Sequence, residues 1–88
     1  ITGGDAQFVP LIATHRDRAE LMVLLADLKR QYPELIGKRQ SDTQTINFGD
    51  KGVWHQLILL PPMSRDKATA TCNDLRAAGY ARCSVRPY

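Results

Sequence analysis

The first hydrophobic run of the chain predicts a β-strand. Between Ala6 and Thr14 apolar residues follow one another closely, as they do in a short buried strand. Pro10 lies inside this run, and because proline has no backbone N–H, it favours an edge strand or a bulge. We therefore expect a first strand over residues 6–14 with irregular pairing.

A helical spacing comes next. Apolar residues recur at three- and four-residue steps, which places them on one face of a helix. They are Ala19, Met22, Leu25, Leu28 and Tyr32. Asp17 and Glu20 stand in the D-x-x-E relation of a capping box, and Pro33 stops the helix. The pattern predicts a helix from residue 17 to residue 32.

A two-residue period then predicts a hairpin. After a polar turn at residues 37–40, Thr43, Thr45 and Asn47 alternate with Gln44, Ile46 and Phe48. The tetrad Gly49-Asp50-Lys51-Gly52 supplies the glycines of a tight reversal, and the β-rich run from Val53 to Leu60 follows it. Pro61-Pro62 ends this second strand of the hairpin.

The last part of the chain predicts a helix and a strand. Ser64 is a favourable N-cap and Gly79 a favourable C′ residue. Ala68, Cys72 and Leu75 lie on one face between them, and Ala81, Cys83 and Val85 then alternate with Arg82, Ser84 and Arg86. The order βαββαβ predicts an α+β fold, a two-layer sandwich whose four-stranded antiparallel sheet carries two helices on one face.

The other face of this sheet is expected to be open. Alternation directs His55, Leu57 and Leu59 towards the helices and Trp54, Gln56, Ile58 and Leu60 away from them. With Phe8 and Ile12 of the first strand, the open face would carry a contiguous apolar patch, with Arg82, Ser84 and Arg86 at one margin. An exposed patch of this kind usually marks a protein interface.

Length and composition limit the architecture to one domain. The chain has 88 residues, of which 43% are hydrophobic and 24% charged, and this is too short for two cores. Its longest apolar stretches fall far short of the roughly 20 residues of a membrane span. Since the start, Ile1-Thr2-Gly3-Gly4, has neither methionine nor leader, we expect residues 1–5 to be a flexible remnant and residues 6–88 a single domain.

The candidate chemistry does not favour an enzyme. No nucleophile with a neighbouring base and no carboxylate pair can be assembled, and His15 and His55 have no metal-ligand spacing, so we expect no metal and no cofactor. Lys51-Gly52-Val53-Trp54 is similar to the start of an RNA-binding RNP1 motif, but the later aromatic positions are missing, so nucleic acid is not expected as a partner. Cys72 and Cys83 form either a disulfide or two buried thiols.

The order of several short motifs resembles the SPOR (sporulation-related repeat) family of bacterial cell-envelope domains, chiefly in its alphaproteobacterial form. The matching residues are Gly49 to Leu57, Pro61, Ser64 to Ala68, Cys72, Leu75, Ala77-Ala78-Gly79 and Cys83, with Phe8-Val9, Ala19-Glu20 and Tyr32 to Gly37 in the first half. The resemblance implies the same βαββαβ fold. It also implies a periplasmic fragment of a larger exported or membrane-anchored protein, whose only link to the membrane is an anchor outside this chain.

In this family the open sheet face binds peptidoglycan, typically glycan strands stripped of stem peptides. The resemblance therefore implies glycan recognition by Trp54, Gln56, Arg82, Ser84 and Arg86. It also implies a Cys72–Cys83 disulfide, which an oxidising periplasm would preserve and which would contribute on the order of 2 to 3 kcal/mol.

This chain departs from the family on the same face. The family's first strand commonly carries glutamine, glycine and an aromatic residue where this chain has Pro10, Ile12 and Thr14, and arginines and glycine in the third strand are replaced by Gln56, Ile58 and Leu60. An alternative hypothesis follows, in which the domain binds itself or an envelope protein. Its predicted interface is Phe8, Ile12, Trp54, Ile58 and Leu60.

Overall fold

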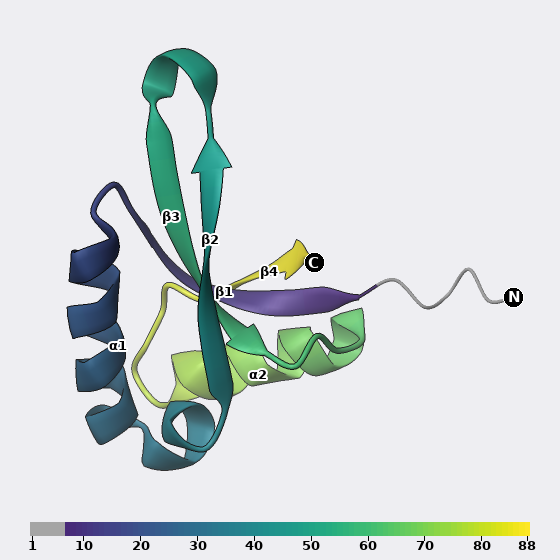
Figure 1. The fold of residues 1–88 in the computed structure, drawn as a ribbon. Coiled ribbons are helices and arrows are strands. Elements are labelled where there is room, and N and C mark those ends of the chain that lie inside the picture. The colour runs from purple at the N-terminus through teal and green to yellow at the C-terminus, as the bar shows by residue number, and fades with distance from the viewer. Residues whose placement is uncertain (1–6) are drawn as a thin grey trace, which may run out of the picture.

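The computed structural model describes residues 7–88, and the expected remnant at residues 1–5 lies outside them. The strands are β1 (Phe8–His15), β2 (Gln40–Asn47), β3 (Val53–Leu60) and β4 (Ser84–Pro87). The helices are α1 (Arg18–Gln31) and α2 (Arg65–Ala77), with a π-helical turn η2 (Pro33–Gly37) and a 3-10 turn η3 (Gly49–Lys51). The predicted βαββαβ order is confirmed (Figure 1).

All neighbouring strands of the sheet are antiparallel, in the order β2-β3-β1-β4. The predicted hairpin is present, and β2 pairs with β3 from Gln40↔Leu60 to Asn47↔Val53. β1 lies between β3 and the short β4, and the Tyr88 amide donates to the Gln7 carbonyl at 2.8 Å just beyond the β1–β4 pairing. The hairpin extends beyond both helices (Figure 1).

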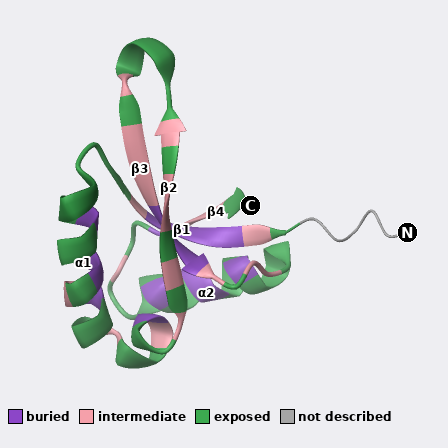
Figure 2. Cartoon of the chain, viewed as in Figure 1, coloured by how far each residue is buried: buried purple, intermediate pink, exposed green. Residues whose placement is uncertain are grey.

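Both helices pack on the same face of the sheet, as predicted. Leu21, Leu25 and Leu28 of α1 and Cys72 and Leu75 of α2 are buried in one core with residues of β1 and β3. The remaining members of this core are Ile12, Ile36, Leu57, Leu59 and Cys83. The buried positions of the helices face the sheet (Figure 2). Among residues 7–88, no helix packs on the second face of the sheet.

The helix ends follow the predicted caps with one difference. The Asp17 carboxylate accepts from the Ala19 amide at 2.9 Å, and Ser64 Oγ accepts from the Lys67 amide at 3.2 Å. The Asp17 amide, however, donates to His15 Nδ1 at 2.9 Å, so His15 takes the role that a capping box gives to Glu20. His15 therefore has a structural role at the start of α1.

The predicted orientation of β1 is wrong for Phe8 and Ile12. Ile12 is fully buried in the core with the helices, and the guanidinium of Arg65 on α2 lies 5.9 Å from the centre of the Phe8 ring. A bulge at Ile12 interrupts the register between Leu11↔Ile58 and Ala13↔Leu57. Because side chains alternate along a strand, a shift of one position exchanges the two faces. Val9 and Leu11, rather than Phe8 and Ile12, accompany Ile58 on the open face.

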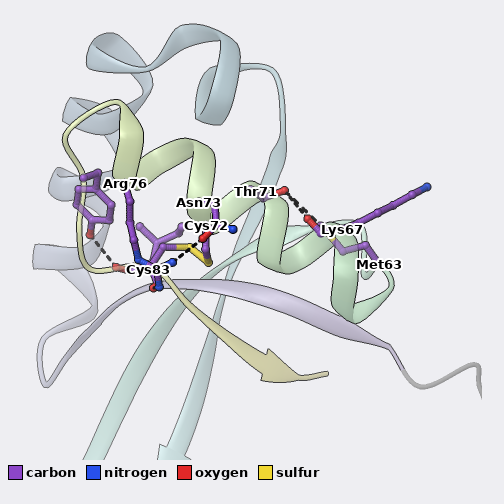
Figure 3. Close-up of a disulfide and its surroundings, with 9 residues drawn as sticks. Met63, Lys67, Thr71, Cys72, Asn73, Arg76 and Cys83 are labelled. Carbon is purple, nitrogen blue, oxygen red and sulfur yellow. Dashed lines mark hydrogen bonds between the residues drawn. A yellow bond between two sulfur atoms is a disulfide. The ribbon is translucent and has the colours of Figure 1, made fainter.

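Cys72 and Cys83 form a disulfide and are not two buried thiols. The bond joins α2 to the residue before β4, with the two Cα atoms 5.1 Å apart (Figure 3). Arg76 reinforces the junction by donating from Nη2 to the Cys83 carbonyl at 2.8 Å and from Nη1 to Asn73 Oδ1 at 2.9 Å. Among residues 7–88, no helix has the length and apolar character needed to span a bilayer.

Candidate functional site

The open face of the sheet gathers four of the five predicted glycan-binding side chains. Leu57 and Leu59 of β3 are in the core with the helices. Because successive side chains of a strand point to opposite faces, Trp54 and Gln56 point away from the helices. On β4, Ser84 lies opposite Leu11 and Arg86 opposite Val9, and these β1 residues belong to the open face. Trp54, Gln56, Ser84 and Arg86 therefore share one face.

Arg82, the fifth residue, lies in the turn before β4 and lines a pocket of about 290 Å³. Ser84 and Arg86 line it from β4, and Leu11 to Thr14 line it from β1. The pairing of β1 with β4 ends at Leu11↔Ser84, so the pocket lies beside the part of β1 that continues past its short partner. Two guanidinium groups and a hydroxyl thus border one concavity, which we call the arginine pocket.

Tyr80 supports the wall of this pocket. Its hydroxyl donates to the Ile12 carbonyl at 2.7 Å, so this backbone carbonyl at the bulge has a hydrogen-bond donor. Burial raises the pKa of the Tyr80 hydroxyl, while the nearby positive charge of Arg82 lowers it in part. The phenol therefore stays protonated and keeps this hydrogen bond over the ordinary pH range.

Trp54 has a partner that the sequence reasoning missed. The Arg16 guanidinium lies 5.3 Å from the centre of the indole ring, and Arg16 Nη2 and Trp54 Nε1 each donate to the Lys51 carbonyl at 3.0 Å. One side of the half-buried ring therefore faces a cation. The sequence gives no local signal for this contact, because it depends on the pairing of β1 with β3, in which Thr14 lies opposite Gln56 on the open face.

The predicted apolar patch of five residues is not assembled as a single surface. Trp54, Ile58 and Leu60 lie on the open face, whereas Phe8 and Ile12 lie on the helix side. Ile58 packs with Val9 and Leu11 and is only 1% exposed, which leaves little of it for a partner. Leu60 is partly buried beside this cluster.

The described residues show no further concentration of reactive groups on this face. Within residues 7–88, no three His, Cys, Asp or Glu side chains come together as a metal site. His55 Nδ1 lies 3.1 Å from Thr45 Oγ1 on the helix side of the sheet. A larger cavity of about 540 Å³ lies between residues 61–64 and α2, away from the predicted site.

Comparison of the chain with protein-family models, with curated proteins and with solved structures finds no match. The class of protein is therefore defined here by geometry alone. It is an α+β domain with a four-stranded antiparallel sheet, one face of which is covered by two helices, and the arginine pocket lies at the margin of the other face.

Proposed function

We propose that this domain is a non-catalytic binding module of the bacterial cell envelope that recognises peptidoglycan glycan strands through the open sheet face. The observation that carries the proposal is the register of β3 and β4, which puts Trp54, Gln56, Ser84 and Arg86 on one face. The arginine pocket adds Arg82 at the margin of that face. The resemblance to SPOR domains supports the same ligand.

The chemistry of these side chains suits a glycan. Arg82 and Arg86 can donate charge-assisted hydrogen bonds to the lactyl carboxylate of a muramyl sugar, and Gln56 and Ser84 can bond its hydroxyl and acetamido groups. The indole of Trp54 offers an apolar surface to the face of a sugar ring, on the side that Arg16 leaves free. Removal of stem peptides frees the carboxylates, so denuded strands should bind more tightly.

The Cys72–Cys83 disulfide supports a location outside the cytoplasm. Disulfides persist in oxidising compartments and are rare in the bacterial cytoplasm. A periplasmic position within a larger exported or membrane-anchored protein agrees with this bond and with the proposed ligand.

The test is retention of the chain on isolated sacculi before and after amidase treatment. We expect more retention after treatment and a loss of roughly tenfold in the Arg82→Gln/Arg86→Gln double variant, since bonds between charged groups are removed. Lys29→Gln/Arg30→Gln on α1 is the matched control, because it removes the same charge from exposed positions outside the open face. Absence of retention at low salt, or an equal loss in the control, would contradict the proposal.

A second candidate is association with another copy or with an envelope protein through Trp54, Ile58 and Leu60. The partly buried Leu60 beside the Val9–Leu11–Ile58 cluster is the observation that favours it. It ranks second because Ile58 itself is 1% exposed. A dimer in analytical ultracentrifugation that Leu60→Ser abolishes, together with no retention on sacculi, would reverse this order.

A further inference from the structure

Two large apolar side chains are exposed at the end of the β2–β3 hairpin. The hairpin projects past the helices, and its turn is exposed to solvent (Figures 1 and 2). Phe48 and Val53 flank the turn and are 47% and 46% exposed. The Phe48 amide donates to the Gly52 carbonyl at 2.9 Å, and this bond closes the turn between the two residues. We call residues 46–54 the hairpin tip.

Val53 lies opposite the polar Asn47, and the next cross-strand pair away from the turn is apolar. Ile46 lies opposite Trp54, and both are partly buried. Basic groups lie beside them, since Lys51 is in the turn and the Arg16 guanidinium donates to the Lys51 carbonyl at 3.0 Å. Asp50 is the acidic residue of the turn, so these three charged groups sum to +1.

Several backbone groups of the turn already have hydrogen-bond partners, within the tip or on Arg16. The Gly49 amide donates to Asn47 Oδ1 at 2.9 Å, and the Gly52 amide donates to the Gly49 carbonyl at 2.9 Å. The Lys51 carbonyl accepts from both Arg16 and Trp54. Loss of water around a tip with these internal bonds therefore costs less than it would for an unpaired loop.

The shape of the tip determines which partner it fits. A stable protein interface takes about 800 Å² from each partner, and a narrow two-stranded projection cannot supply that area on its own. A bilayer surface is deformable and accepts a projecting apolar group. Aromatic side chains with a polar end favour the membrane–water boundary, and basic side chains there are attracted to anionic lipids.

We propose that the hairpin tip docks on an anionic lipid bilayer. Phe48 and Val53 enter the boundary between headgroups and acyl chains, Trp54 lies at the level of the headgroups, and Lys51 and Arg16 contact lipid phosphates. This surface is separate from the arginine pocket. It gives the domain its own contact with a membrane, in addition to any anchor elsewhere in a parent protein.

The experiment uses the 88-residue chain with vesicles of phosphatidylglycerol and phosphatidylcholine. Trp54 is the single tryptophan, so its fluorescence reports binding directly, and we expect a blue shift as vesicles are added. Phe48→Ser/Val53→Ser should weaken sedimentation with vesicles roughly tenfold or more, because it removes the two apolar side chains that enter the bilayer. Lys51→Gln should weaken it about fivefold on anionic vesicles only.

The matched control is Met22→Ser/Val23→Ser on α1, whose side chains are 42% and 61% exposed and lie outside the hairpin tip. We expect this variant to bind vesicles as the wild type does. Absence of a fluorescence shift and of sedimentation at low salt, equal losses in both double variants, or a dimer sensitive to Phe48→Ser would overturn the proposal. Arg82→Gln/Arg86→Gln should keep vesicle binding, which separates this proposal from that of glycan recognition.

Discussion

At the scale of single residues, Tyr80 connects three parts of the molecule. Its hydroxyl bonds the Ile12 carbonyl of β1, and its ring meets the edge of Tyr32, at the end of α1, with centroids 6.3 Å apart. Tyr80 itself lies between α2 and β4. One phenol thus ties the bulge, the first helix and the final turn together.

Tyr80→Phe should reduce the free energy of unfolding by about 1 kcal/mol at neutral pH, because it deletes one partly buried hydrogen bond. The pKa of Tyr80 is raised in the folded state, so above about pH 10 the unfolded chain loses this proton first and stability falls as pH rises. Urea unfolding at about pH 8 and about pH 10.5 measures both effects. We expect the difference between wild type and Tyr80→Phe to shrink at the higher pH; parallel pH dependences would contradict this.

The same scale shows where sequence patterns fail. In β3, Leu57 and Leu59 are in the core, as the predicted alternation has them, and Trp54 and Gln56 are on the opposite face. In β1, apolar residues occupy both odd and even positions, so the two-residue period does not determine which of them face the helices. Pro10 signals irregular pairing, but it does not reveal that the bulge falls at Ile12.

At the scale of elements, local signals suffice for the hairpin and for the helix caps. Gly49 and Gly52 have positive φ angles of 67° and 86°, which explains why glycine occupies both ends of the turn. The contact of Arg16 with this turn has no such local signal. Its contact with the Lys51 carbonyl spans 35 positions and depends on how β1 and β3 pair.

Gly52→Ala should destabilise the fold more than Gly49→Ala. Gly52 combines φ 86° with ψ −170°, a region that is essentially restricted to glycine, and its new Cβ would lie 2.8 Å from Arg16 Nη2. A Cβ on Gly49 meets nothing within 4 Å. We expect losses of about 1 to 3 kcal/mol for Gly52→Ala and about 1 kcal/mol for Gly49→Ala in urea unfolding.

Trp54 fluorescence gives a second measurement on the same pair of variants. Displacement of Arg16 by Gly52→Ala should change the emission of the folded state, whereas Gly49→Ala should leave it as in the wild type. Equal destabilisation with identical spectra would show that Arg16 is not held against the turn.

At the scale of the whole molecule, the order of elements was enough to predict the two-layer fold and its open face. Each helix has a single buried stripe, and one face of a four-stranded sheet is large enough to cover both. The order of elements does not predict the ligand of the open face. That ligand depends on a few side chains such as Arg82 and Gln56, whose chemistry suits several partners.

Cys72→Ala/Cys83→Ala should lower the free energy of unfolding by on the order of 2 to 3 kcal/mol. The bond joins residues with a sequence separation of 11 and so restricts the conformational entropy of the unfolded chain. Its removal restores that entropy and stabilises the unfolded state. Urea unfolding of the variant and of the wild type, each with and without reductant, is the measurement. Reductant should lower the free energy of unfolding of the wild type towards that of the variant and leave the value of the variant unchanged. A wild type that is equally stable with and without reductant would contradict the assignment of the disulfide.

The hydrogen bond between Tyr88 and Gln7 has a consequence for how this unit can be combined with others. β1 and β4 run side by side in opposite directions, so polypeptide attached before β1 and after β4 departs from the same end of this strand pair. A short link between these two points would close the chain into a ring without breaking a strand pair. The unit is therefore suited to insertion as a cassette within a host loop, and to circular permutation with new ends opened elsewhere on its surface.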